Sequence, residues 1–153
     1  MDDFDKKILT HLQNDSGIPL RKLGELVGLS LSACHKRVRK LKKDGIIRQT
    51  SIILSERALG YRINALVRVS LASQTRLALE RFEAAVVGSP NVMDCFLLSG
   101  TSDYLIRIVS KDIEEFEALH RGVLAELPGV LRIETSFSIR TVCRRHCLPL
   151  STA

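Results

Sequence analysis

The 153-residue chain has few aromatic side chains: Trp is absent, and Phe, Tyr and Trp together make up 5% of the residues. Proteins that bind single-stranded nucleic acid commonly stack bases on aromatic rings, so this composition argues against that class. The chain also lacks a run of about 18 apolar residues, the length that spans a bilayer. It opens with an acidic segment, residues 1–5, rather than with the apolar stretch of a secretory signal. We therefore expect a cytoplasmic protein without a membrane segment.

Cysteines are too few and too scattered for a disulfide framework. Cys34 and Cys95 lie in apolar patterns, which favours buried, reduced thiols. Cys143, His146 and Cys147 offer three potential zinc ligands, but two arginines lie between them and no second closely spaced pair occurs elsewhere. The sequence thus predicts no metal site and no cofactor.

Positive charge is concentrated in the first part of the chain. The net charge is +6, with 23 Lys and Arg against 17 Asp and Glu. Residues 1–60 contain 12 basic and 7 acidic side chains, whereas residues 61–153 contain 11 and 10. This asymmetry predicts that the first segment faces a polyanion and that the second does not.

Residues 31–43 predict a helix with one apolar and one cationic side. Ser30 is a suitable N-cap, and Gly45 is suited to ending the helix. The apolar side is spaced as a buried helical stripe, and the opposite side is basic. The apolar positions are Leu31, Cys34, Val38 and Leu41, and the opposite side carries Ser32, Ala33, Lys36, Lys40 and Lys43, flanked by Arg37 and Arg39. Alone, this pattern also fits a solvated, lysine-rich surface helix.

The neighbouring segments favour a DNA-binding interpretation. Residues 4–14 predict a first helix with Phe4, Ile8, Leu9 and Leu12 on one face. A short second helix follows Pro19, and the turn 28–30 connects it to the basic helix. Its apolar face consists of Leu20, Leu23, Leu26 and Val27. Two helices joined by a tight glycine turn are typical of a helix-turn-helix, whose second helix reads the major groove. The β-prone residues 46–54 could then form a small wing.

From residue 61 the periodicity changes to that of a mixed α/β domain. Alternating patterns predict strands at 63–71, 92–98, 104–109 and 131–139, and helical spacing predicts helices at 75–87 and 112–127. The order βαββαβ is that of the ferredoxin-like fold, an antiparallel sheet covered by helices on one face. Because the other face is also fairly apolar, we expect it to pack against a second subunit. The predicted class is α+β, with a winged helix-turn-helix at 1–50, a linker at 51–61 and a ferredoxin-like domain at 62–153.

These segments resemble the Lrp/AsnC (leucine-responsive/asparagine regulator, feast/famine) family of transcription factors along nearly the whole chain. The resemblance rests on residues 5–9, 23–30, 37–41, 44–47 and 59–60, on the G-x-x-D-Y turn at 100–104, and on Leu127-Pro128-Gly129-Val130. It implies a DNA-binding domain followed by an effector-binding domain that assembles dimers and often tetramers or octamers. It also implies an effector, usually an amino acid, held between subunits near the G-x-x-D-Y turn.

The predicted DNA-binding residues are those that the basic helix presents to the groove. Lysine and arginine neutralise phosphates and pair with guanine edges, and small residues in the first turn allow close approach to bases. Ser32 and Ala33 are equally ordinary at the start of a helix, and His35 is better suited to flanking or packing. The candidates are Ser30, Ser32, Ala33, Lys36, Arg37, Arg39 and Lys40.

The predicted effector site centres on the turn at residues 100–104. Backbone N–H groups would hold a carboxylate and Asp103 would pair with an ammonium, as an amino-acid zwitterion requires. The alternative is a structural hairpin in which Asp103 bonds local backbone. Residues of the last strand could line the same cavity. The candidates are Gly100, Thr101, Asp103, Tyr104, Thr135, Ser136 and Ser138. His120 is better explained as a core or interface histidine.

The sequence contains no catalytic motif: no G-x-S-x-G elbow, P-loop or G-x-G-x-x-G occurs. We therefore predict a protein that is not an enzyme but a sequence-specific transcriptional regulator of double-stranded DNA. Its activity or assembly would respond to a small effector, and it would be nucleoid-associated. The alternative is an architectural DNA-binding protein of the same fold that senses no ligand.

Overall fold

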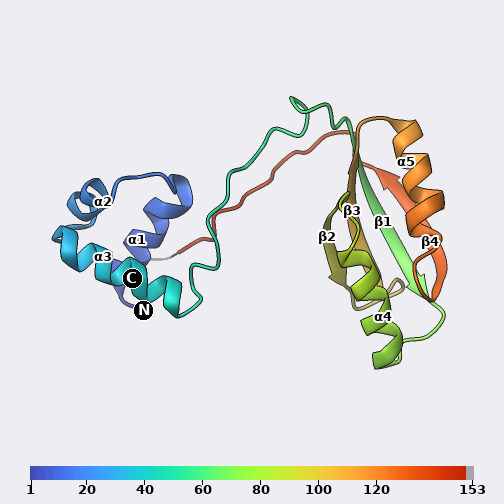
Figure 1. Ribbon diagram of the computed structural model, residues 1–153, viewed down its shortest axis with the longest axis horizontal. Coiled ribbons are helices and arrows are strands. Elements are labelled where there is room, and N and C mark those ends of the chain that lie inside the picture. The colour runs from blue at the N-terminus through green and yellow to red at the C-terminus, as the bar shows by residue number, and fades with distance from the viewer. Residues whose placement is uncertain (151–153) are drawn as a thin grey trace. The chain divides into compact units, whose positions relative to one another are not determined.

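The computed structural model describes residues 1–150 and divides the chain into two compact units (Figure 1). The first contains residues 1–53 together with the C-terminal segment from residue 142, and the second contains residues 54–141. We call them the helical unit and the sheet unit. The prediction ended the DNA-binding domain at residue 50 and assigned every residue from 62 to 153 to the second domain. In the structure, residues 142–150 lie with the helical unit instead.

The helical unit contains three helices, α1 (Asp3–Asn14), α2 (Leu20–Val27) and α3 (Leu31–Lys43). Asp2 caps α1 in a reciprocal capping box with Asp5, and Ser30 caps α3 by accepting a hydrogen bond from the Ala33 N–H at 3.3 Å. Gly28 ends α2 with a φ of 73°, a conformation that suits glycine. The predicted helix-turn-helix, its cap and its turn are therefore present. The buried core of this unit is formed by Ile8, Leu9, Leu23, Val27, Cys34, Val38 and Leu41.

Three apolar residues predicted to face this core are largely exposed instead. Leu31, at the first position of α3, is 53% exposed, because the contacts of that helix with the core begin one turn later at Cys34. Leu26 is 50% exposed at the end of α2. Phe4 is 40% exposed and lies beneath the Arg37 guanidinium, 5.4 Å from the ring centroid.

The expected wing does not form strands: residues 44–62 contain only turns, bends and irregular backbone. The N–H groups of Ile46 and Ile47 both donate to the Leu41 carbonyl, at 3.0 and 3.1 Å. Gly45, with a φ of 72°, allows the chain to turn back over the end of α3 in this way. Two of the donors that a hairpin ladder would use, those of Ile46 and Ile47, therefore close the helix instead.

The sheet unit has the predicted βαββαβ order: β1 (Ile63–Leu71), α4 (Arg76–Val87), β2 (Val92–Leu97), β3 (Tyr104–Ser110), α5 (Ile113–Leu119) and β4 (Val130–Phe137). A single π-helical turn, His120–Leu124, follows α5. The four strands pair antiparallel in the order β2-β3-β1-β4. This confirms the ferredoxin-like prediction.

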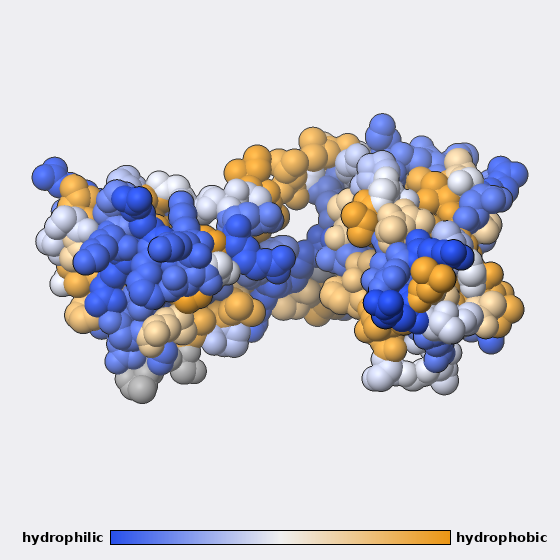
Figure 2. Space-filling model, turned by 60° about the horizontal axis from the view of Figure 1, so that its bottom comes forward, coloured by the Kyte–Doolittle hydropathy of each residue, from blue (hydrophilic) through white to orange (hydrophobic). Residues whose placement is uncertain are grey.

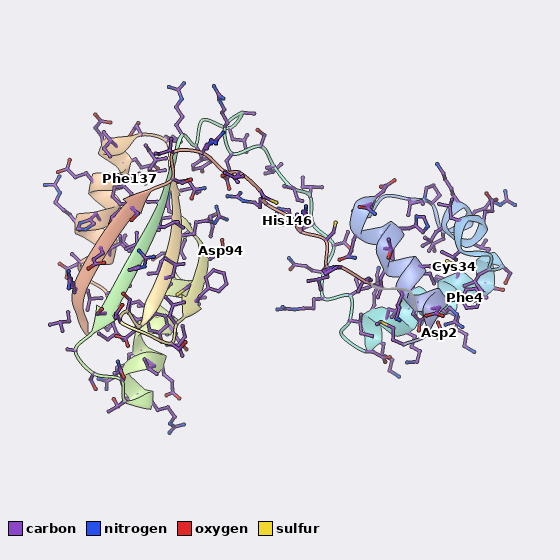
Figure 3. All side chains as sticks on the ribbon, turned by 180° about the vertical axis from the view of Figure 1, so that it is seen from behind. Asp2, Phe4, Cys34, Asp94, Phe137 and His146 are labelled. Atoms are coloured by element: carbon purple, nitrogen blue, oxygen red, sulfur yellow. The ribbon has the colours of Figure 1, made fainter. Side chains whose placement is uncertain are left out.

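Both helices pack on one face of this sheet, because residues of α4, α5 and alternate strand positions share a single core. Its members include Ala65, Val67, Val69, Phe82, Val86, Tyr104, Ile106, Phe116 and Leu124. The opposite face, which we call the open face, carries the intervening strand residues, among them Leu66 and Phe96, both exposed. Cys95, predicted to be buried, is exposed on the edge strand β2. Figure 3 shows Asp94 on this edge strand and Phe137 on the opposite edge strand, β4.

None of the helices in the described part of the chain is both long and apolar enough to cross a bilayer. The same residues bring no three His, Cys, Asp or Glu side chains together as a group that could hold a metal ion.

Candidate DNA-binding and effector sites

The outward side of α3 carries a row of exposed polar and cationic residues. Cys34, Val38 and Leu41 are buried against α1 and α2, so the remaining positions face solvent. The exposed positions on this side are Ser32, Lys36, Arg39, Lys40 and Lys43, and Ala33 is half-buried beside them. The space-filling view shows a broad hydrophilic surface over the helical unit (Figure 2). The predicted division of α3 into a buried and an exposed side is therefore confirmed.

The start of α3 is held by short polar contacts. Ser30 Oγ accepts the Ala33 N–H and lies 3.2 Å from Ser32 Oγ, so both hydroxyls sit at the helix N-terminus. The first turn of α3 contains no acidic residue. Unpaired N–H groups and the positive end of the helix dipole make such a terminus suitable for a phosphate.

Arg37 does not share this outward arrangement. Its Nη1 donates to Asp2 Oδ2 at 2.7 Å and to Asp5 Oδ1 at 2.8 Å, so it joins α3 to the capped start of α1. Hydrogen bonds to Asp5 and Asp2 raise the pKa of the Arg37 guanidinium. The pKa of Asp2 is lowered, mainly by the hydrogen bond from the Asp5 N–H and then by the one from Arg37. Figure 3 shows Asp2 and Phe4 together at this end of α1. Within the chain, Arg37 therefore positions α3 against α1 rather than projecting with Lys36 and Arg39.

Replacing Arg37 with methionine should test this reassignment. The change keeps an apolar stem over Phe4 but removes the bonds to Asp2 and Asp5. Because the ion pairs of Arg37 with Asp2 and Asp5 are partly exposed to solvent, we expect the free energy of unfolding of the helical unit to fall by about 1 kcal/mol. The salt dependence of DNA binding should not change, because no phosphate contact is lost. Thermal unfolding and a salt titration of DNA binding measure the two effects, and a shallower salt dependence would restore Arg37 to the DNA contacts.

Lys40 pairs with Asp44 one turn further along α3. This pairing raises the pKa of Lys40, and the ammonium stays charged. The Lys40 side chain is 73% exposed, and exposed ion pairs of this kind contribute little stability. Lys40 can therefore exchange its carboxylate partner for a phosphate at small cost.

In the sheet unit, the G-x-x-D-Y turn connects β2 to β3. Gly100 has a φ of 139°, which few other residues adopt. Asp103 Oδ2 accepts the Leu71 N–H and Oδ1 accepts from Gln74 Nε2, both at 2.7 Å. The Asp103 N–H donates to the Val69 carbonyl. Asp103 thus fastens the turn to the end of β1, 32 residues earlier in the chain, rather than to the local backbone of its own hairpin.

Tyr104 points away from the exposed part of the turn. It is 1% exposed, its ring lies 4.4 Å from that of Phe82, and its hydroxyl donates to Glu83 Oε1 at 2.8 Å. Burial and the Glu83 carboxylate raise the pKa of Tyr104 well above its ordinary value. Within the chain, Tyr104 is therefore a core residue rather than an exposed residue of the turn.

Three residues near the end of the chain were predicted to line a cavity with this turn, and the structure disperses them. Thr135 and Ser136 point to opposite faces of β4 because strand side chains alternate. Thr135 lines a shallow hollow of about 380 Å³ between α5 and β4, whereas Ser136 lies on the open face. Ser138 donates its N–H to the Asn64 carbonyl, seven residues along β1 from the Asp103–Leu71 contact, or roughly 23 Å. Within one chain they share no cavity with the turn.

Comparison with known proteins identifies the family. The model of the Lrp/AsnC ligand binding domain matches residues 64–147, and that of a winged helix-turn-helix DNA-binding domain matches residues 1–48. The chain belongs to the Lrp/AsnC family. It is a transcriptional regulator with a DNA-binding domain and a ligand-binding domain, and its relatives are regulators rather than enzymes.

Individual relatives match along almost their full length. The Bkd operon transcriptional regulator of Pseudomonas aeruginosa is 37% identical, with 98% of each chain covered. The transcriptional regulator AzlB of Bacillus subtilis is 33% identical, with 98% of this chain and 96% of AzlB covered. A crystal structure of the transcriptional regulator NMB0573 of Neisseria meningitidis, in complex with L-Met, is 33% identical with a TM-score of 0.92, covering 98% of this chain and 97% of that one.

Proposed function

We propose that this Lrp/AsnC regulator binds double-stranded DNA through the outward side of α3 and an amino acid at the turn 99–103. Ser30, Ser32, Ala33, Lys36, Arg39 and Lys40 are the DNA-contacting residues of this proposal. The observation that supports it is the separation of α3 into a side buried against α1 and α2 and an exposed, cationic side. Cations on an exposed helix after a glycine turn suit the phosphates and base edges of a major groove.

The effector part of the proposal concerns the free backbone of the turn. Among the hydrogen bonds of residues 1–150, none is donated by the N–H groups of residues 99–102. Consecutive free N–H groups form an anion-binding concavity suited to a carboxylate. Asp103 accepts two hydrogen bonds, and a carboxylate has about four acceptor positions, so it can still accept an ammonium. The L-Met complex of the similar Neisseria protein supports an amino acid as the effector.

The open face of the sheet supports self-association as part of this function. Leu66 of β1 and Phe96 of β2 are exposed on this face, and α4 and α5 both pack on the other face of the sheet. A second copy would bury these side chains and hold two α3 helices at once, about 34–36 Å apart on DNA. Dimers of this kind, assembled further into tetramers or octamers, would act on the chromosome in the cytoplasm.

Calorimetric titration with the common amino acids tests the effector site. We expect one or a few of them to bind, and Asp103→Asn to weaken binding about tenfold, because the ammonium loses a charged acceptor. The asparagine oxygen can still accept the Leu71 N–H, and the exposed Gln74 amide can turn its own oxygen toward the new NH2 group, so the melting temperature should change little. Glu134→Gln is the matched control, since it removes an exposed carboxylate from β4 without touching the turn.

Binding that is equal in the wild type and in Asp103→Asn would move the effector away from the turn. Absence of binding by every amino acid, together with equal affinity for all DNA sequences, would instead favour the architectural DNA-binding protein.

A further inference from the structure

The C-terminal segment 142–150, which we call the clasp, is fastened to α1 of the helical unit. Gln13 forms a two-point contact with the backbone of Leu148: its Nε2 donates to the Leu148 carbonyl at 3.3 Å, and its Oε1 accepts the Leu148 N–H at 2.6 Å. A side-chain amide that satisfies both groups of one residue fixes that residue in position and direction. In Figure 3, His146 marks this segment.

Two further contacts extend the attachment on either side of Leu148. The Cys147 thiol donates to the Gln13 carbonyl at 3.4 Å, and this carbonyl belongs to the last turn of α1, where helix carbonyls lack partners. Leu150 is half-buried against the core of the three helices. The clasp therefore adds both hydrogen bonds and apolar contact to the helical unit. The match to the ligand-binding domain runs to residue 147, so the sequence comparison counts most of the clasp with the other domain.

The clasp also changes the charge of the unit it joins. It contributes Arg144 and Arg145, both exposed, and no acidic residue. With the clasp, the helical unit has 13 Lys and Arg against 6 Asp and Glu, while the sheet unit has 10 against 11. All of the surplus positive charge of the protein thus belongs to the unit that binds DNA. These two cations belong to the Cys-Arg-Arg-His-Cys segment, residues 143–147.

We propose that the clasp is a working part of the DNA-binding surface, in which Arg144 and Arg145 contact phosphates of the DNA bound by α3. Guanidinium groups suit phosphate because their donors form a fixed fork. The contact between Gln13 and Leu148 keeps the two arginines on the unit that binds DNA. Their segment is therefore already ordered, and less conformational entropy is lost when they bind phosphates. This inference builds on DNA binding by the helical unit and adds contacts that the helix-turn-helix alone does not have.

The double variant Arg144→Gln/Arg145→Gln in the full-length protein tests the contact. Fluorescence anisotropy with a mixed-sequence duplex, repeated over a salt series, should show weaker binding and a shallower salt dependence. Each lost phosphate contact lowers the slope of log K against log salt by about 0.9, so we expect a decrease of about 0.9 to 1.8. The melting temperature should change little, because polar contacts of exposed side chains contribute little stability. An unchanged slope would overturn the proposal.

Arg76→Gln/Arg121→Gln is the matched control, because it removes the same charge from exposed helix positions of the sheet unit. This variant should keep the wild-type slope, and an equal decrease would show a general charge effect rather than contact. Gln13→Leu tests the anchor. It should reproduce the shallower slope, and adding the two arginine substitutions to it should change the slope no further. A wild-type slope in Gln13→Leu would show that the anchor plays no part.

Discussion

Replacement of Lys36 and Arg39 together by alanine should lower the affinity for DNA by about 100-fold at moderate salt. Both side chains are exposed on the side of α3 opposite Cys34 and Val38, and neither takes part in an ion pair among the described residues. Each is expected to make one charge-assisted contact, worth roughly tenfold in affinity. The fold should be unaffected, because neither residue touches the core.

The salt dependence tells how these residues act. If both neutralise phosphates, the slope of log K against log salt decreases by about 1.8, and the loss is equal for all DNA sequences. If one of them reads a guanine edge, the loss is larger on a preferred sequence than on a mixed-sequence duplex. Lys111→Ala, an exposed lysine of the sheet unit, is the control and should bind as the wild type does. Unchanged affinity in the double variant would show that α3 is not the recognition helix.

The elements of this fold could be predicted because their signals are local. Ser30 and Gly28 act through the backbone of the next few residues, and helical or alternating spacing records which side of an element is buried. The alternation of side chains along a strand also predicts that Thr135 and Ser136, as adjacent residues, point to opposite faces of the sheet. The prediction of one shared cavity overlooked it.

The partners of individual side chains could not be predicted in this way. Arg37 resembles its neighbours on α3, and only the packing of α1 beside it brings in Asp2 and Asp5, more than 30 residues earlier. Similarly, Gln13 meets Leu148 across 135 positions. These contacts depend on tertiary structure, and a spacing rule that covers a few residues contains no information on them. The strands of the wing are absent for a related reason: β propensity at Ile46 and Ile47 gave way to capping of α3.

Gly24 has the closest neighbour of any glycine in the helical unit, and Gly24→Ala should both destabilise the unit and weaken DNA binding. A Cβ at this position would lie 2.8 Å from the Leu29 carbonyl oxygen and 3.6 Å from Cys34 Cβ. The oxygen belongs to the backbone of the turn, and the Leu29 N–H donates to the Gly24 carbonyl at 2.8 Å, so the turn cannot move away without losing this bond. α2 and α3 must therefore separate at their crossing.

Alanine is favoured over glycine inside a helix by up to about 1 kcal/mol, so the sign of the effect tests the close contact directly. We expect overpacking of about 1–3 kcal/mol to exceed this gain, giving a lower melting temperature of the helical unit and reduced affinity for DNA. Gly122→Ala is the matched control. A Cβ there meets nothing within 4 Å, so the same change in the sheet unit should be neutral or stabilising. If Gly24→Ala lowered the melting temperature no more than Gly122→Ala does, the turn would not hold α3 at a fixed distance from α2.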